Sequence, residues 1–438
     1  MDGLKLKKIN SILADVKSRV KPDNSILRNI DDAVKKINNY IHSSKIDAEC
    51  VKGGSIAKNT FLKNDHDVDL FVRFASRYPD EELSDMLETI LKETFPKQAI
   101  NRIHGSRDYY QFKLNELDYE IIPVIKLHKS NFHESRNITD FSPLHVEWTG
   151  KHIAQKPELS DEIRIAKQFC KANNVYGAES YINGFSGHIV DILIIYYGSF
   201  LSLIKKFSSI DEVSIKSPII IDTERALANP LKELNKSKIS PLIIVDPVQS
   251  TRNAATALGK EKLLVFIDAC KRFIENPSKD FFEMNKFDLK KKINEMKNKN
   301  ESCKLILIKI KTLDGSKDVV GTKVYKVYAD LIKQISLNDF KILDSFWNFD
   351  FKKKSSIILY AFDKEKLSET LERIGPPLNS KIDVQKFKEK HDKTRIKGNR
   401  IYSTIKRKYV IPEKLLKDLF EEKYISDRVK GISIEKIY

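Results

Sequence analysis

The chain has 438 residues, enough for two to four domains, and 41% of them are hydrophobic, which is sufficient to fill substantial cores. Lys and Arg (78) outnumber Asp and Glu (61), and the formal net charge of +17 is typical either of a protein with a polyanionic partner, nucleic acid first, or of a solvated basic surface. The four cysteines have no CxxC spacing and no paired histidines nearby, so the pattern argues against a zinc site or a disulfide framework and favours free thiols in a reducing cytosol.

The N-terminal part of the chain shows no targeting segment. Its first residues, MDGLKLKKIN, lack the apolar core of a signal peptide. Residues 12–42 predict helix with a break at Pro22. The longest apolar run, residues 189–204, is shorter than a membrane span and contains Asp191, so it predicts a buried helix. These features together predict a cytoplasmic protein.

Strand and helix patterns alternate over the next part of the chain. DAECV predicts a strand that enters a Gly-Gly-Ser turn at residues 53–55, and SIAKNTFLK predicts a short helix over 55–63. DVDLFVRF predicts a strand over Asp67–Phe74, with its aliphatic residues on one face and both aspartates on the other. A charged helix, DEELSDMLETILKETF, and two strand candidates, YYQFKL and DYEIIPVIKL, follow.

The pattern becomes helical from about Ser160, which we expect to cap the helix SDEIRIAKQFCKANN. A proline-flanked segment, SPLIIVDPVQSTRNAATAL, separates this helix from another, ALGKEKLLVFIDACKRFIEN. Beyond Pro277, a lysine-rich stretch over 286–300 precedes the strand KLILIKIK, a helix over 323–335, the strand SSIILYAF and a helix that reaches Gly375. This β-α-β-α alternation predicts a separate small α/β unit, which a basic and aromatic tail follows.

The aspartate pair is the strongest chemical signal in the sequence. Asp67 and Asp69 stand at i, i+2 in a strand, and such close like charges are stabilised by a cation between them. Asp118 and Glu120, in a later strand, offer a third carboxylate with the same spacing. Three carboxylates after a Gly-Gly-Ser turn favour a two-metal phosphoryl-transfer site, in which backbone N–H groups and the Ser55 hydroxyl meet the phosphates. A solvated aspartate pair is the alternative for the pair alone, and the turn is not a P-loop because it lacks the GK[ST] ending.

These residues carry a resemblance to known enzymes. GGS…AKNT…DVDLFV is similar to the signature of the DNA polymerase β-like nucleotidyltransferases. PLHVEW, KANNVYGAE, GFSGHIVDILIIYYGSF, IVDPVQSTRNAATAL and NRIYSTIKRKY resemble, in that order and over nearly the whole chain, the archaeal class I CCA-adding enzymes. The resemblance implies template-independent building and repair of the 3′-terminal CCA of tRNA from CTP and ATP, with release of pyrophosphate. A poly(A) or oligoadenylate polymerase, or an RNA-binding protein with a relic head, is the alternative.

The resemblance implies a fold and a division into domains. We expect a multidomain α/β (α+β) protein with a polymerase β-like head, a helical neck, an α/β body and a tail. The head would be the nucleotidyltransferase domain, the neck would bind the nucleotide base, and the body and tail would bind tRNA. The predicted bounds are 1–150, 151–277, 278–394 and 395–438. A homodimer is left open.

The family pattern places the metal carboxylates, with two Mg²⁺ ions, on Asp67, Asp69 and Glu120. The usual order in the family is Glu, Asp, Asp, whereas this chain has Asp, Asp, Glu, so the choice between Glu120 and Asp118 stays open. Glu120 precedes IIP as the family carboxylate does, and we prefer it.

The family pattern also implies a set of nucleotide contacts. Lys58 stands where the family usually has an arginine, and a lysine keeps the charge but loses the bidentate fork. Arg252 would be the base-reading residue, because a guanidinium can donate to acceptors on C and A that U and G lack. The implied contacts to the triphosphate, ribose and base are Ser55, Lys58, His145, Lys167, Tyr176 and Arg252.

Four of these residues have ordinary structural alternatives. His145 beside Trp148 could be a core histidine, and Tyr176 could close a helix end. Lys167 could belong to a solvated basic helix face, and Arg252 could form a salt bridge with Asp246.

Contacts to tRNA are expected in the basic part of the chain. Because A-form helices are read mostly by shape, the acceptor–TΨC arm would be held through phosphates and 2′-hydroxyls. The lysine-rich stretch 286–300 is one candidate surface, with a solvated basic surface as the alternative. The candidates in the tail are Arg395, Lys397, Arg400, Lys406, Arg407 and Lys408.

Overall fold

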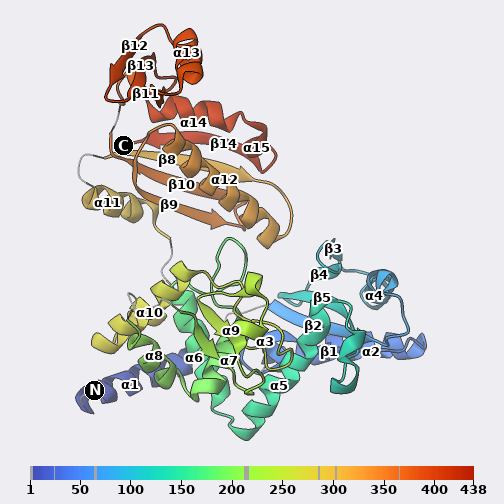
Figure 1. The fold of residues 1–438 in the computed structure, drawn as a ribbon. Coiled ribbons are helices and arrows are strands. Elements are labelled where there is room, and N and C mark those ends of the chain that lie inside the picture. The colour runs from blue at the N-terminus through green and yellow to red at the C-terminus, as the bar shows by residue number, and fades with distance from the viewer. Residues whose placement is uncertain are drawn as a thin grey trace. The chain divides into compact units, whose positions relative to one another are not determined.

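A computed structural model describes residues 3–23, 25–63, 67–211, 217–284, 287–300, 303–364 and 366–438. The chain divides into two units, residues 1–285 and 286–438 (Figure 1). Among the described residues, no single helix is long and apolar enough to cross a membrane, and one bent helix pair meets the length and composition criteria. The four cysteines are free thiols, as predicted.

Five strands form the sheet that carries the aspartate pair. Their order is β1-β2-β5-β4-β3, and β2 runs parallel to β5 while the other pairs are antiparallel. Helices α2 and α4 pack with the aliphatic side chains of β2 in one core, so the predicted strand and its buried face are confirmed. The bounds are β1 Ala48–Lys52, β2 Asp67–Phe74, β3 Asn101–Ile103, β4 Tyr109–Leu114, β5 Leu117–Ile125, α2 Ser25–Ser43, α3 Gly54–Ala57 and α4 Asp80–Thr94.

A helical core completes the first unit. Helix α1 packs against α6, and the ring of Phe169 lies at the centre among five other phenylalanine rings. The apolar run predicted as one buried helix is two, α7 and α8, because Gly198 takes a φ of +77° and the chain bends by 92° there. The bounds are α1 Gly3–Val20, α5 Ser142–Gln155, α6 Leu159–Ala172, α7 Gly187–Tyr197, α8 Phe200–Ser208, α9 Pro230–Glu233, α10 Lys260–Glu275, β6 Ile219–Ile221 and β7 Leu242–Ile244.

Two predictions about helix ends in this unit were wrong. The N-cap residue of α6 is Glu158, whose side chain makes no capping hydrogen bond, and the hydroxyl of Ser160, the second residue of the helix, donates to the carbonyl of Pro157 instead of capping. The helix predicted over 55–63 ends at Ala57, because Asn59 takes a left-handed φ of +52° that an α-helix excludes. Short 3₁₀ helices span Lys129–Glu134, Ile138–Phe141, Lys236–Lys238 and Lys279–Phe282.

The second unit is built on a four-stranded antiparallel sheet in the order β14-β8-β10-β9. Helices α12 and α14 share one core with this sheet, which gives a β-α-β-β-α-β path through the chain. Sheets of this kind can stack RNA bases on their open face. Here Ile293 and Met296 of α11 pack on Leu305 and Leu307 of β8 and on Leu359 and Ala361 of β10. Helix α11 therefore covers part of the face opposite α12 and α14. The bounds are α11 Leu289–Lys299, β8 Lys304–Thr312, α12 Lys317–Leu337, β9 Ile342–Asp350, β10 Ser355–Phe362, α14 Pro412–Phe420, α15 Lys423–Ser426 and β14 Val429–Ile437.

A small subdomain is inserted between β10 and α14, and it corrects a prediction. The segment expected to be a helix up to Gly375 is strand β11, because pairing with β13 outweighs its local helix preference. Gly375 is needed there, since a Cβ would lie 2.7 Å from the side chain of Ile401. The sequence prediction also missed β9, an edge strand. The bounds in the subdomain are β11 Thr370–Pro377, α13 Lys381–Lys390, β12 Thr394–Lys397 and β13 Arg400–Lys406.

Candidate active site

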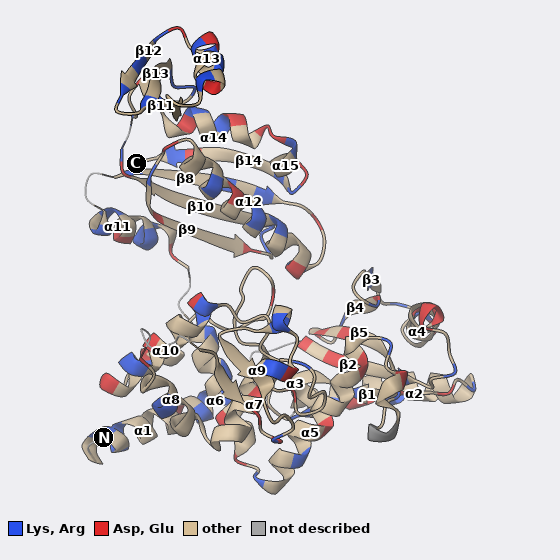
Figure 2. Ribbon diagram, in the orientation of Figure 1, with Lys and Arg blue, Asp and Glu red and all other residues tan. Residues whose placement is uncertain are grey.

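The parallel pairing of β2 with β5 brings the strand carboxylates together. Its register sets Asp69 beside Glu120 and Asp67 beside Asp118, so all four lie on one face of the sheet, as the alternation predicts. Acidic segments on both strands are visible in Figure 2. Asp69 and Glu120 are half-buried, whereas Asp67 and Asp118 are exposed at the strand ends. The register therefore favours Glu120 over Asp118 as the partner of Asp69.

The surroundings of Asp69 and Glu120 disfavour their negative charge. Burial raises the pKa of Asp69, and Asp67 raises it further, while Lys58 and Lys167 act against the shift. Burial also raises the pKa of Glu120, and a hydrogen bond from Gln111 Nε2 at 2.9 Å opposes it. A divalent cation between the two strands would reverse both shifts, since a bound cation favours the ionised carboxylate. These residues therefore fit a metal ion.

The Gly-Gly turn lies directly against Asp69. The N–H of Gly53 donates to the main-chain carbonyl of Asp69 at 2.8 Å. Gly54 has a φ of +50°, and a Cβ built on it would lie 1.7 Å from Asp69 Oδ2. Only glycine permits both this conformation and this contact. The turn thereby fixes the position of the Asp69 carboxylate. Ser55 is the next residue after Gly54.

Two predicted phosphate lysines meet at a buried aspartate. Lys58 Nζ donates to Asp191 Oδ2 at 2.5 Å, and Lys167 Nζ lies 3.7 Å from Oδ1 and donates to Thr60 Oγ1 at 2.9 Å. Burial opposes ionisation of Asp191, but the two ammonium groups outweigh it and lower the pKa of Asp191. Lys167 is 2% exposed and its neighbour Arg164 is equally buried, so the solvated-face alternative is wrong for both.

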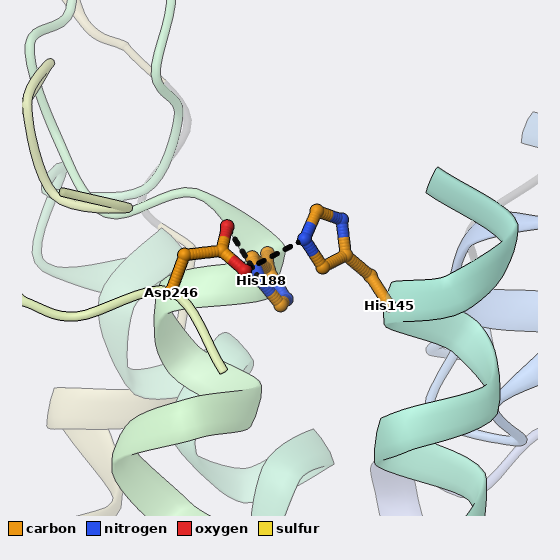
Figure 3. A group of neighbouring side chains, drawn as sticks. All are labelled: His145, His188 and Asp246. Atoms are coloured by element: carbon orange, nitrogen blue, oxygen red, sulfur yellow. Dashed lines mark hydrogen bonds and ion pairs between the residues drawn. The ribbon is translucent and has the colours of Figure 1, made fainter. Parts of the chain in front are cut away.

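A second buried aspartate, Asp246, contacts His145, the predicted triphosphate or ribose contact, and Arg252, the predicted base reader. Figure 3 shows Asp246 with His145 and His188. His145 Nε2 lies 2.9 Å from Asp246 Oδ1, and Arg252 donates to Oδ2 at 2.8 Å, so the salt bridge considered as an alternative for Arg252 is present. His188 Nε2 is 3.8 Å from Oδ2, too far for a hydrogen bond. Burial opposes ionisation of Asp246, yet the two histidines hold its pKa far below its usual range. Burial also lowers the pKa of His188 to about 4.

This cluster is a poor metal site despite its composition. The ligand atoms of His145, His188 and Asp246 lie within 4.8 Å of one another. However, Asp246 Oδ1 already accepts from the N–H groups of Val248 and Gln249, and Oδ2 is bound to a guanidinium. A cation would have to displace these donors and face the charge of Arg252. We therefore regard Asp246 as the anchor of Arg252 and His145.

Tyr176 lies at the start of α7, close to Lys167. It follows α6 and forms an isolated bridge with Phe185, and its ring lies 5.3 Å from the ammonium group of Lys171. A Cβ on Gly187 would be 3.0 Å from the Tyr176 hydroxyl and 4.0 Å from Lys167 Nζ. The first turn of α7 thus makes room for both groups, and the structure brings Lys58, Lys167 and Tyr176 together around this helix.

The sequence matches three families in order. Residues 28–144 match the nucleotidyltransferase domain, residues 161–283 the second domain of tRNA nucleotidyltransferase, and residues 301–433 the C-terminal domain of CCA-adding enzyme. A CCA-adding enzyme of Nanoarchaeum equitans is 31% identical over 82% of this chain and 84% of its own length. The chain belongs to the CCA-adding enzymes. It is a tRNA nucleotidyltransferase that adds the 3′-terminal CCA, and the poly(A)-polymerase alternative is not favoured.

Further similarities agree with this family. A CCA-adding enzyme of Methanocaldococcus jannaschii is 28% identical over 98% of this chain and 93% of its own length. Among solved structures, a cytoplasmic RNA terminal U-transferase superposes on 64% of the chain with a TM-score of 0.50 and 13% identity. The Cid1 terminal uridylyl transferase covers 65% with a TM-score of 0.51 and 11% identity. These structures show that the enzyme has the nucleotidyltransferase fold.

The predicted tRNA contacts of this CCA-adding enzyme lie in the second unit, residues 286–438, whereas the strand carboxylates belong to the first. Lys397 and Lys406 are exposed on β12 and β13. The other four have protein partners: Arg395 pairs with Glu372, Arg400 donates to the carbonyl of Gly375, Arg407 pairs with Asp339, and Lys408 lies over the ring of Tyr409. Of these, Arg407 is the least exposed.

Sequence reasoning missed Gly187, His188 and Asp191 of α7 as site residues of the enzyme. The signal was the single carboxylate in the apolar run IVDILIIYY, which was used only to argue against a membrane span. A buried charge needs a charged partner, so Asp191 alone indicated that a cation from elsewhere would meet it. Nothing in the sequence indicated that the cations would be the two predicted phosphate lysines.

Changing Gly54 to Ala should damage the enzyme without unfolding it. The new Cβ would overlap Asp69 Oδ2 and strain the backbone, and a displacement of about 1 Å at such a group costs about 100-fold in rate. The measurement is kcat for CCA addition to a CCA-less tRNA, with circular dichroism to follow the fold. Gly150→Ala is the matched control, because a Cβ there has no neighbour within 4 Å, and it should keep wild-type activity. Equal rates for the two variants would contradict the role of the turn.

Proposed function

We propose that Asp67, Asp69 and Glu120 hold two Mg²⁺ ions in the enzyme. Nucleotidyltransferases of this superfamily use divalent metal ions. The proposal is supported by the register of β2 and β5, by the raised pKa values of Asp69 and Glu120, and by the glycine turn that fixes the Asp69 carboxylate. When bound, the ions would supply activation of the tRNA 3′-hydroxyl and neutralisation of charge on the triphosphate.

The triphosphate is proposed to bind beside the carboxylates, at the start of α7. Lys58 directly follows the short helix α3, whose Gly54 lies against the Asp69 carboxylate, and Lys167 shares Asp191 with Lys58, so both ammonium groups belong to the surroundings of the glycine turn. The hydroxyls of Ser55 and Tyr176 are the proposed neutral donors. Asp191 is one carboxylate between two ammonium groups, so this group of three side chains carries a net positive charge that suits an anionic ligand.

The base is proposed to be read by Arg252, with His145 as a neighbour on the nucleotide. CCA-adding enzymes act on tRNA with CTP and ATP. C and A share a ring lone pair next to an exocyclic amine, whereas U and G carry an N–H at that ring position. A guanidinium has five N–H donors, and Asp246 binds NH1, so the group is oriented while other donors remain for the base.

The second unit is proposed to hold the acceptor–TΨC arm of tRNA. Its exposed lysines, including Lys397 and Lys406, would contact phosphates. Residues 1–150 would then be the catalytic head, 151–277 the base-binding neck, 278–394 the body and 395–438 the tail. The observation that carries the whole proposal is the pairing of Asp69 with Glu120 beside the glycine turn.

Asp69→Asn and Glu120→Gln should each reduce CCA addition by about a thousandfold or more, because each removes a metal ligand worth several kcal/mol in the transition state. Asp118→Asn is the matched control, since Asp118 is exposed and lies beside Asp67 at the strand end. The measurement is single-turnover extension of a CCA-less tRNA, with tRNA binding followed in parallel. An inactive Asp118→Asn together with an active Glu120→Gln would reverse the assignment.

Arg252→Ala should lose discrimination as well as rate. A base that cannot accept from a buried donor leaves the donor unpaired, at about 1–3 kcal/mol per lost bond, so removing the donor should improve UTP and GTP relative to CTP and ATP by about 5- to 150-fold. The measurement is kcat/KM for the four nucleotides on tRNA lacking CCA and on tRNA ending in CC. Unchanged ratios with a uniformly lower rate would assign Arg252 a structural role.

Binding of tRNA should weaken steeply with salt, because phosphate contacts release counterions. Replacing Lys397 and Lys406 by Ala should lower the slope of log affinity against log salt concentration by about 1 for each lysine that contacts a phosphate. Lys35→Ala, an exposed site in the first unit, is the control and should keep the slope. A salt-independent affinity would mean that the net charge of +17 is unrelated to tRNA.

A further inference from the structure

Asp191 is a buried charge in an apolar environment. It lies in the middle of α7 at 0% exposure, and its neighbours Val190 and Ile192 belong to the helical core. Its charge partners come from two other segments, Lys58 from the end of the glycine turn and Lys167 from α6. One carboxylate thus joins three segments that are distant in sequence.

Stability alone gives no reason for a charge at this position. A buried ion pair is often no more stabilising than apolar side chains of the same volume, because desolvation cancels most of the attraction. A carboxylate does, however, change its lysine partners. Two neighbouring ammonium groups repel each other, and an anion between them offsets this repulsion and fixes their direction.

The geometry of the lysine pair points toward the site of the phosphates. Lys58 follows α3, whose Gly54 lies against the carboxylate of Asp69, and its ammonium group shares Asp191 of α7 with that of Lys167, so the lysine pair connects the glycine turn with α7. Lys167 is further held by Thr60, through Oγ1 at 2.9 Å and the main-chain carbonyl at 3.2 Å. On the same helix, one turn before Asp191, Gly187 makes room for the Tyr176 hydroxyl.

We propose that Asp191 is a positioning residue that orients the Lys58 and Lys167 ammonium groups toward the pyrophosphate portion of the incoming nucleotide. It touches neither nucleotide nor metal and acts through the two lysines. This inference rests on the proposed phosphate role of those lysines. It assigns to α7 the recognition of the pyrophosphate group, the part that CTP, ATP and the released product have in common.

Asp191→Asn tests the proposal, because the amide keeps the shape of the side chain and removes its charge. Inorganic pyrophosphate is the probe. Its inhibition constant and the KM values for CTP and ATP should all rise about tenfold or more by a common factor, as expected for a lost charged hydrogen bond. The preference for CTP over UTP should stay at its wild-type value, and the increase in melting temperature caused by pyrophosphate should shrink. An unchanged inhibition constant in the folded variant would overturn the proposal.

Asp140→Asn is the matched control for a lost buried carboxylate. Asp140 is 1% exposed and pairs with Arg107 in the head core, outside the proposed site. The variant should lower the melting temperature and leave pyrophosphate inhibition unchanged. A rise in the inhibition constant as large as that of Asp191→Asn would show that the Asp191 effect is general destabilisation, and would overturn the proposal.

Two further variants separate this proposal from the one it rests on. If Lys58→Met and Lys167→Met leave pyrophosphate inhibition unchanged, the phosphate role of the lysines is wrong, and the Asp191 inference falls with it. If they raise the inhibition constant and Asp191→Asn does not, only the inference about Asp191 fails.

The double lysine variant, Lys58→Met with Lys167→Met, also covers the case in which Asp191→Asn alone does not fold. Adding Asp191→Asn to this variant leaves an uncharged, well-packed site. Because Asp191 is proposed to act only through the lysines, the inhibition constant and the KM for CTP should stay within about twofold of the double variant. A further tenfold rise would show that Asp191 acts by another route and would overturn the proposal.

Discussion

The arrangement of the active site depends on the ion pairs of Asp191. The interior of the helical core is a poor solvent for charge, so the carboxylate is stable there only with Lys58 and Lys167 beside it. Lys58 follows the glycine turn that lies against Asp69, and Lys167 is part of α6. These contacts therefore hold the glycine turn beside β2 against the helical core of the first unit. The same charges lie where the phosphates of the nucleotide are proposed to bind.

Helix α7 divides the proposed nucleotide site into two parts with different chemistry. Asp191 and Gly187 face the lysines and Tyr176, where charge and space suit phosphates. His188 packs against His145, with ring centroids 4.2 Å apart, beside the Asp246 anchor of Arg252. All nucleotides share the phosphates but differ in the base. The proposed phosphate contacts and the proposed base contacts can therefore be altered independently. This separation explains how one site could bind CTP and ATP alike and still discriminate by base.

The second unit contributes a different kind of surface. Its sheet has the connectivity used by single-stranded RNA readers, yet α11 covers part of the face on which bases would stack. The exposed side chains of this unit include many lysines, and some of its basic residues are already paired, as Arg395 is with Glu372. Such a surface suits the phosphates of a folded helix better than exposed bases. The expected tRNA interaction is accordingly one of shape and charge.

The sequence by itself determined the strand Asp67–Phe74, the shared face of its two aspartates and the family, because side-chain alternation and ordered motifs are local properties. It also predicted a buried helix for the apolar run that contains Asp191, although this run forms two helices. It mispredicted β11 and missed β9, since strands of that kind are stabilised by partners rather than by their own residues. Only the tertiary structure decided that Glu120 lies beside Asp69, that Gly54 touches its carboxylate, and that Asp191 and Asp246 anchor the predicted lysines and arginine. Each of these contacts joins segments that are distant in the sequence. Tertiary packing and the parallel strand register bring them together, and the residues of one segment alone encode neither the packing nor the register.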